Sequence, residues 1–340
     1  AKRTPVGAFQ GSLSSVSAPQ LGATVIKSLF DETAIDVNEV DEVIMGNVLS
    51  AGLGQAPARQ AALYAGLPNS VECLTINKMC GSGLKAVILG AQAIQSSDAE
   101  VVIAGGMENM SSAPYLLPKG RSGYRLGHGK IEDSVIKDGL WDVYTDQHMG
   151  NCAEICARGK NYSREQQDEL AKESYTRAQN AQENGSFDLE IVSVEVPQRK
   201  GNSIQVSVDE EPGRANFNKM PNLRPAFDKD GTITAANASK INDGAAAVLI
   251  MSAAKAEELG LEPKVRIVAQ ASAAHEPEWF TTAPVKAIQY VLAKAGMKTD
   301  EIDLWEINEV FAPVAQAAMD EFDLDSSKVN VHGGAIALGH

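Results

Sequence analysis

One cysteine lies where a predicted strand turns into a predicted helix. The segment Asn77-Lys-Met-Cys80-Gly-Ser-Gly-Leu-Lys follows a strand-like run, and apolar residues at helical spacing begin directly after it. Amide groups and the dipole at a helix N-terminus stabilise a thiolate, and an amide in such a turn can bind a developing oxyanion. Gly81 and Gly83 permit a sharp turn and close approach of a substrate. Cys80 is therefore a candidate nucleophile, and the alternative is a small buried cysteine at a tight turn.

A second glycine-rich turn ends at His340. The segment Val329-Asn-Val-His-Gly-Gly-Ala-Ile-Ala-Leu-Gly-His340 again starts like a strand and continues into glycines. It is a weak match to a phosphate-binding loop, because no GKS/T or GxGxxG pattern follows. By itself, His340 indicates little.

The two turns occupy matching places in a weak internal repeat. In each half an Ala-Pro pair opens a predicted helix that leads to an aspartate before a strand. Cys80 lies 39 residues after Asp41, and His340 lies 37 residues after Asp303. A true repeat predicts two related halves whose turns face each other across a pseudo-dyad and build one site. The alternative is chance similarity between two short α/β units.

The other cysteines offer less chemistry. Cys73 lies inside a predicted strand and is interpreted as core filler. Cys152 and Cys156 follow His148 at four-residue steps. On one helix the ends of that run are about 12 Å apart, so three such side chains cannot all reach one metal ion. We predict no metal site.

Strand-like and helix-like segments alternate along the chain, which predicts a layered α/β fold. The expected strands are residues 42–48, 72–77, 101–105, 191–196, 246–251, 265–271 and 303–307. The expected helices are residues 19–32, 57–65, 83–95, 164–184, 253–258, 284–295 and 310–320. Residues 111–239 interrupt the alternation with turn residues and mixed charge, and they are interpreted as an insertion.

The charge limits the range of partners. The chain of 340 residues has 30 Lys+Arg and 44 Asp+Glu, a net charge of −14. Such a balance disfavours nucleic acid and anionic membranes as main partners, but it permits a small anionic ligand at a local basic patch. The longest apolar stretch, from Ala245 to about Ala254, is shorter than the ~20 residues of a membrane helix. Four irregularly spaced cysteines and no visible targeting segment predict a reduced, cytoplasmic protein.

Six motifs together resemble the thiolase family, and one of them resembles its acetyl-CoA acetyltransferase branch. In chain order they are Cys80-Gly-Ser-Gly-Leu-Lys-Ala-Val, Ala104-Gly-Gly-Met-Glu-Asn-Met-Ser, His148-Met-Gly, Asn237-Ala-Ser-Lys-Ile-Asn-Asp-Gly-Ala-Ala-Ala, Asn308-Glu-Val-Phe and Asn330-Val-His-Gly-Gly-Ala-Ile-Ala-Leu-Gly-His340. They occur in family order over essentially the whole chain. His148-Met-Gly is the motif that favours the short-chain branch.

The resemblance implies two βαβαβαββ halves related by a pseudo-dyad, in an αβαβα layered arrangement with an inserted loop domain. The first half would comprise residues 1–110 and about 240–262. The loop domain, expected to serve tetramerisation and coenzyme A binding, would comprise 111–239. The second half, 263–340, would be incomplete.

The resemblance also implies roles for single residues. Cys80 would become acylated, His340 would activate it, and Asn308 would hold a water in an oxyanion hole. The coenzyme A channel would be lined by Leu140, His148, Met149, Phe227, Ala235, Ser239 and Phe311. A thiolate exchanges readily with a thioester, and covalent capture divides carbon–carbon bond formation into two steps.

Basic residues of the loop region give a hypothesis for the phosphates of the coenzyme. We expect Arg214 or Lys219 to meet them. The alternative is a solvated loop of mixed charge, because Glu210 and Glu211 are interleaved.

The chain departs from the family pattern in several places. The family's second catalytic cysteine lies in a Cys-x-Gly-Gly-Gly motif that would follow His340, and a short strand usually precedes Lys2. We therefore expect a chain trimmed at both ends. Val310, Lys219 and Phe280 stand where Ala, Ser and Met are usual, which affects details of the acyl pocket and the adenosine end.

The sequence thus predicts an acetyl-CoA C-acetyltransferase that uses coenzyme A thioesters as substrates and holds no permanent cofactor. Exposed-looking apolar residues between Tyr115 and Trp141 favour an interface, and the resemblance implies a tetramerisation loop there, in a homotetramer that is a dimer of dimers. The alternative is an ordinary loop packed on its own chain. Three alternatives stay open. One is a 3-ketoacyl-CoA thiolase of fatty-acid β-oxidation, another a decarboxylating ketosynthase, and the third a non-catalytic coenzyme A- or lipid-binding relative.

Overall fold

The computed structural model describes residues 1–340, which divide into two compact units. The first unit comprises Ala1–Trp141, Glu190–Ser207 and Asn242–Lys264. The second comprises Asp142–Leu189, Val208–Ile241 and Val265–His340. The three-part division expected from the sequence stays a prediction.

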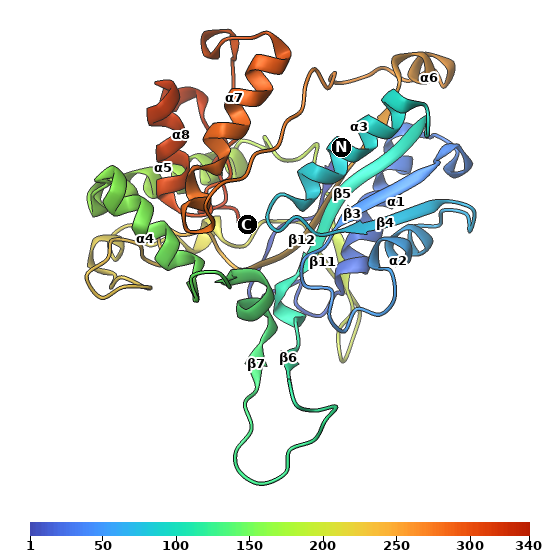
Figure 1. The fold of residues 1–340 in the computed structure, drawn as a ribbon. Helices are drawn as coiled ribbons and strands as arrows, with labels where there is room; N and C mark the ends of the chain where they lie inside the picture. Colours follow the sequence, from blue (N-terminus) through green and yellow to red (C-terminus); the bar gives the residue numbers. More distant parts are fainter. The chain divides into compact units, whose positions relative to one another are not determined.

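A six-stranded sheet organises the first unit, in the order β1-β12-β5-β3-β4 with β2 paired to β12 (Figure 1). Its strands β3, β4 and β5 are parallel, whereas β12 runs antiparallel to β5 from Asp243↔Asn109 to Met251↔Val101. The strands are β1 (Lys2–Arg3), β2 (Gly7–Ala8), β3 (Glu42–Gly46), β4 (Glu72–Ile76), β5 (Val101–Asn109) and β12 (Asn242–Met251). The unit's helices are α1 (Ala18–Thr33), α2 (Pro57–Tyr64), α3 (Ser82–Ser96) and α6 (Ala253–Glu258).

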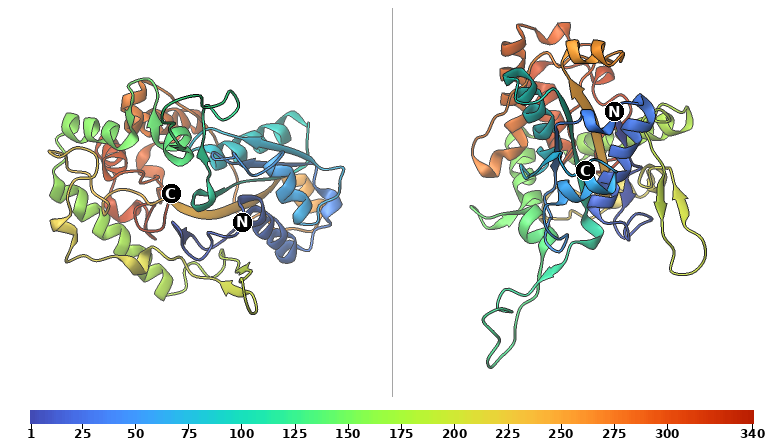
Figure 2. Two further views of the ribbon diagram at one scale, coloured as in Figure 1. Left: turned by 90° about the horizontal axis from the view of Figure 1, so that it is seen from below. Right: turned by 90° about the vertical axis from the view of Figure 1, so that its right-hand side faces the viewer.

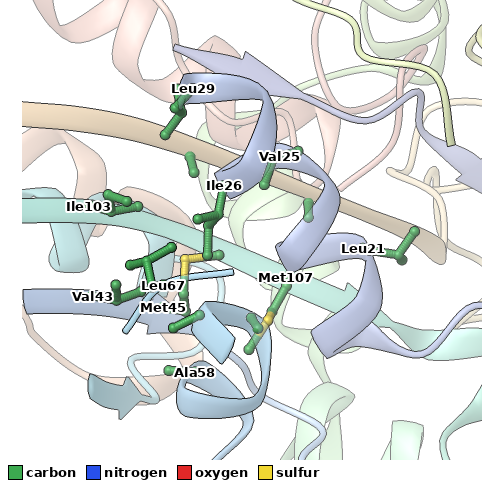
Figure 3. Close-up of a cluster of buried hydrophobic side chains, with 14 of the residues drawn as sticks. Leu21, Val25, Ile26, Leu29, Val43, Met45, Ala58, Leu67, Ile103 and Met107 are labelled. Atoms are coloured by element: carbon green, nitrogen blue, oxygen red, sulfur yellow. The ribbon is translucent and has the colours of Figure 1, made fainter. Parts of the chain in front are cut away.

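Alternation along the central strands buries both faces of this sheet. Val43 and Ile103 pack with α1 and α2 on one face, and Ile44 and Val102 pack with α3 on the other. Successive strand residues point to opposite faces, so apolar residues at every position require a cover on each side. Figure 3 shows the first face, where Leu21, Val25, Ile26 and Leu29 of α1 meet side chains of β3 and β5.

Local signals set the ends of the helices. The Gln20 side chain accepts a hydrogen bond from the Ser17 amide at 3.1 Å, and Pro19 lies in the first turn of α1. Both features favour a helix start, because they satisfy or remove amides that have no partner within the helix. The helix ends at Ala34, which has a left-handed φ of 55°.

A long excursion leaves the sheet between β6 (Tyr115–Leu116) and β7 (Glu132–Asp133), which pair in antiparallel fashion. Figure 1 and the right-hand view of Figure 2 show it extending from the first unit as an open loop. A second hairpin joins β10 (Val194–Val196) to β11 (Ile204–Val206). Two further short strands are β8 (Trp141–Asp142) and β9 (Gln147–His148).

Helices dominate the second unit. They are α4 (Met149–Lys160), α5 (Arg164–Glu183), α7 (Ala283–Ala295) and α8 (Ala312–Phe322). Helix α5 begins at a capping box in which Ser163 and Gln166 exchange hydrogen bonds of 2.8 and 3.2 Å. One core cluster joins Ala171, Tyr175 and Ala178 of α5 to Ala312 and Ile336. No helix of the protein is both long and apolar enough to cross a bilayer.

Two of the expected strands are wrong. Residues 265–271 pair with no other strand, and residues 303–307 make a single bridge, between Trp305 and Val329. An apolar run becomes a strand only where another strand supplies ladder hydrogen bonds, and here Val265 and Val268 are 85% and 59% exposed. Helix α4 was not expected, because its buried face consists largely of small residues.

Replacing Ile103 tests the sheet core. Ile103→Ala removes a fully buried side chain beneath α1, and we expect the free energy of unfolding to fall by about 2–5 kcal/mol. Val265→Ala is the control, since Val265 is 85% exposed and lies outside the β6–β7 excursion, and its effect should stay within about 0.5 kcal/mol. Denaturant unfolding measures both, and equal losses would contradict the assignment of the core.

Candidate functional site

Cys80 lies in a turn that its own polar neighbours hold. The Ser82 hydroxyl accepts the Lys78 amide at 2.8 Å and donates to the Met79 carbonyl at 2.6 Å. The Asn77 side chain accepts the Met79 amide at 2.9 Å, although Met79 has a left-handed φ of 49°. Strained backbone persists only where its surroundings hold it in place. The turn therefore presents Cys80 in a set position, just before the N-terminus of α3.

Close packing beneath this turn requires a glycine in β3. A Cβ on Gly46 would lie 2.5 Å from Cβ of Ser82, closer than real Cβ contacts. Gly46 thus allows the first turn of α3 to rest directly on the sheet. The distance of Cys80 from the sheet is therefore set by this packing as well as by the loop.

The protonation state of Cys80 calls for a base. Desolvation raises the pKa of the thiol, and the residue's own amide lowers it to a smaller extent. The side chain is nevertheless solvent-accessible. A raised pKa leaves the thiol protonated near neutral pH, so nucleophilic attack needs a group that takes the proton.

The carboxylate of Glu108, which has no role in the sequence prediction, stabilises the same region. Glu108 of β5 accepts hydrogen bonds from the Val48 amide at 2.8 Å, the Leu49 amide at 3.2 Å and the Asn47 side chain at 2.8 Å. The Val48 carbonyl in turn accepts the Asn77 side chain at 3.5 Å. The signal in the sequence was a glutamate inside an otherwise apolar strand. Desolvation raises the pKa of Glu108 to about 7, and the charge of Asp243 contributes to the rise.

In the second unit, hydrogen bonds join three of the sequence motifs. The Ser239 amide donates to the Val310 carbonyl at 3.0 Å, and the Ala312 amide donates to the Asn237 carbonyl at 3.0 Å. Buried Glu309 accepts the Asn330 side chain at 2.9 Å and, less closely, an amide of the glycine-rich turn. Segments 237–239, 308–312 and 330–336 therefore form one connected framework.

Aromatic side chains cluster beside this framework. The rings of His148 and Phe227 stack with centroids 4.7 Å apart, and Phe311 meets Phe227 edge-on at 5.8 Å. Met149 and Phe280 pack with the same cluster. His148 Nδ1 accepts the Gly150 amide at 3.0 Å, so a neutral ring carries its proton on Nε2 as a donor. Desolvation lowers the pKa of His148, which favours the neutral ring.

The structure places the remaining expected residues as follows. Asn308 and His340 are solvent-accessible, and desolvation lowers the pKa of His340. Leu140 belongs to the first unit, where it ends a short helical turn. Cys80 also belongs to the first unit and His340 to the second, so their meeting in one site stays a prediction.

The two expected phosphate ligands differ in their surroundings. Arg214 pairs with Glu211 at 3.5 Å and with Glu210 at 3.9 Å, which offsets part of its charge. Lys219 is exposed beside a short turn. No group of three or more His, Cys, Asp or Glu is arranged to hold a metal ion. Cys152 and Cys156 are buried in α4.

Comparison with known proteins gives consistent likenesses. Residues 1–254 match the family model "Thiolase, N-terminal domain", and residues 261–340 match "Thiolase, C-terminal domain". An acetyl-CoA acetyltransferase of Pseudomonas aeruginosa is 53% identical over 341 aligned positions, covering 100% of this chain and 87% of that protein. One of Yarrowia lipolytica is 53% identical, covering 100% and 85%. The crystal structure of Acat5 thiolase from Ascaris suum in complex with coenzyme A superposes with a TM-score of 0.95 at 43% identity, covering 100% of this chain and 87% of that one.

Glu108→Gln tests the brace beneath the turn. A carboxyl group whose folded pKa lies above its unfolded value binds protons more tightly in the folded state, so its contribution to stability falls as pH rises from about 4.5 to about 7. Relative to the variant, wild-type protein should therefore lose about 2–3 kcal/mol of unfolding free energy between about pH 5 and pH 8. Urea unfolding at each pH measures the difference. Glu257→Gln, on the exposed side of α6, is the control, and parallel curves for wild type and Glu108→Gln would contradict the prediction.

Proposed function

This chain belongs to the thiolase family, and from that premise we propose that it is an acetyl-CoA C-acetyltransferase. The enzyme joins two molecules of acetyl-CoA to acetoacetyl-CoA and free coenzyme A, and it runs thiolysis in reverse. The observation that carries the proposal is the accessible Cys80 in its braced turn at the start of α3. The expected α/β fold of this family is confirmed by the superposition on the Ascaris suum enzyme.

The first half-reaction transfers an acetyl group to Cys80. His340 takes the thiol proton, and the sulfur attacks the thioester carbonyl. The bond from carbon to the sulfur of coenzyme A breaks, and the departing thiolate is protonated. The amide of Cys80, just before α3, helps to stabilise the oxyanion that forms during attack. The raised pKa of the thiol and the lowered pKa of the imidazole keep both groups neutral before the substrate arrives.

The second half-reaction forms the carbon–carbon bond. A base removes an α-proton from a second acetyl-CoA, and the resulting enolate attacks the acetyl group on Cys80 and releases the thiol. A water held by Asn308 stabilises the enolate oxygen.

Coenzyme A is the substrate carrier in this proposal. The Ascaris suum relative was crystallised with it. Nε2 of His148, the Ser239 side chain and the Phe227–Phe311 ring pair offer a donor, a hydroxyl and an apolar wall of the kinds that a pantetheine arm needs. Met149 packs with these rings, and the proposal also assigns Leu140 and Ala235 to the channel and Arg214 or Lys219 to the phosphates.

The proposal includes a homotetramer in the cytoplasm. Its support is the exposed apolar surface of the β6–β7 excursion, where Leu117 is 53%, Leu126 is 103% and Ile131 is 67% exposed. Large apolar side chains exposed along one segment favour a protein interface. The four free cysteines fit a reducing compartment.

Acetylation of Cys80 tests the function directly. Incubation with acetyl-CoA should add one acetyl group, which peptide mass spectrometry locates at Cys80. Because the pKa of the His340 imidazole is lowered and that of the thiol is raised, the rate of labelling should level off once the imidazole is neutral and stay nearly constant between about pH 7 and about pH 9. Cys80→Ala should lower labelling and thiolysis by at least about 10³-fold, whereas Cys73→Ala is the matched control. Labelling that persists in Cys80→Ala would exclude the mechanism.

Removing apolar side chains from the excursion tests the assembly. The triple variant Leu117→Ser, Leu126→Ser and Ile131→Ser should convert tetramers to smaller species, because its interface loses apolar area. Light scattering of the full-length protein at a series of concentrations measures the mass. A monomeric mass for the wild type, or an unchanged tetramer in the variant, would reject this part of the proposal.

A further inference from the structure

Lys240 directly follows the segment that contributes Ser239, and its ammonium group is used inside the protein. Its Nζ donates to the Ala235 carbonyl at 2.7 Å and to the Ala238 carbonyl at 2.8 Å. The same group lies 5.6 Å above the centre of the Tyr175 ring. Two carbonyl oxygens and an aromatic face therefore surround one cation.

Other side chains hold the same segment, and they bind its backbone donors rather than its acceptors. The Asn237 side chain accepts the Thr234 amide at 2.8 Å and donates to Asp168 at 2.8 Å. The Ala236 amide donates to the Thr234 hydroxyl at 3.2 Å. These contacts satisfy donors of the loop backbone, whereas Lys240 satisfies two of its acceptors. A charged donor forms stronger hydrogen bonds than a neutral one.

The loop that Lys240 ties is also paired with the loop of Asn308. Ala238 bridges Phe311, and the Ser239 amide donates to the Val310 carbonyl at 3.0 Å. Asn308 lies two residues before Val310. A shift of segment 235–239 would therefore move both the hydroxyl of Ser239 and the backbone next to Asn308.

Burial of the Lys240 ammonium group costs desolvation free energy. Desolvation lowers the pKa of its ammonium group to about 8, and the negative charge of buried Glu211 opposes this fall. Tyr175 is itself buried, and its hydroxyl pKa is raised. Burying a charged group costs free energy unless hydrogen bonds compensate, and the carbonyls of Ala235 and Ala238 supply two of them.

We propose that Lys240 is a positioning residue, whose ammonium group ties the carbonyls of Ala235 and Ala238 and thereby sets the acyl-CoA-binding segment against the Asn308 loop. The inference rests on the proposed function of the site. Lys240 does not touch the reacting atoms in this proposal. Its effect passes through Ser239 and the backbone of 310–312.

The test compares Lys240→Met with Lys172→Met in the full-length protein. Methionine keeps the length of the side chain without its donors, and Lys172 is an exposed lysine of α5. We expect the acetyl-CoA concentration that half-saturates Cys80 acetylation to rise about tenfold or more in Lys240→Met, as expected for the loss of charge-assisted hydrogen bonds. The maximal acetylation rate should change less, and Lys172→Met should match the wild type.

Two further measurements separate positioning from general loss of structure. Hydrogen exchange should accelerate at amides 236–240 and 310–312 of Lys240→Met and stay unchanged in the core helix α1. In Lys240→Ala, added propylammonium should restore part of the lost affinity, whereas propanol should not, because only the cation can bind both carbonyls. Half-saturation and exchange equal to the wild type, or rescue by propanol, would overturn the inference.

The outcomes distinguish this inference from the proposed function. If wild-type Cys80 takes no acetyl group from acetyl-CoA, the proposed function fails and exchange at 236–240 and 310–312 alone decides whether Lys240 positions the loops. If wild-type labelling is normal and Lys240→Met behaves like Lys172→Met, only the role of Lys240 is rejected.

Discussion

Backbone amides in loops that carry chemistry must find hydrogen-bond acceptors, and this constraint shapes both units. Loops outside helices and sheets cannot pair all of their amides with backbone carbonyls, and unpaired buried amides are costly. Carboxylates supply the missing acceptors. Glu108 binds the amides of Val48 and Leu49, and Glu154 binds those of Thr232 and Ile233. Glu309 binds that of Ile336 within the glycine-rich turn.

The same constraint explains why a thiol can be both accessible and well placed. The turn at Cys80 exposes the sulfur, yet Ser82 and Asn77 occupy its backbone donors and acceptors. Glu108 supports Asn77 from behind through Val48. Exposure therefore does not bring mobility, and a nucleophile can meet a large soluble substrate while its geometry stays fixed.

In the second unit a cation plays the complementary part. The carbonyls of Ala235 and Ala238 converge, and Lys240 binds both. The carboxylates bind backbone amides and the ammonium group binds backbone carbonyls. Together these hydrogen bonds favour one conformation of each loop. The stacked rings of His148 and Phe227 then lie beside loops that are already ordered. Preorganisation of this kind lowers the entropy lost when a ligand binds.

The sequence alone determined what depends on near neighbours. Helices α1, α2, α3 and α6 begin and end within one or two residues of their predicted limits, because caps, prolines and apolar periodicity are local signals. The turn at Cys80 followed from Gly81 and Gly83, which come after it at a strand–helix junction. The family resemblance predicts the remaining site residues by motif, and their roles stay predictions.

Tertiary structure decided what depends on distant partners. Residues 265–271 and 303–307 have strand-like composition but lack a ladder, because a strand requires a neighbour that composition does not reveal. Glu108 reaches a loop 60 residues earlier in the chain, and Glu309 reaches Ser174 on α5. Lys240 binds carbonyls no more than five residues before it in the chain. These contacts nevertheless require the folded conformation of the loop and the nearby Tyr175 ring. Hydrogen bonds act over a few ångströms in space, so no local pattern of residue types could identify the partners in these contacts.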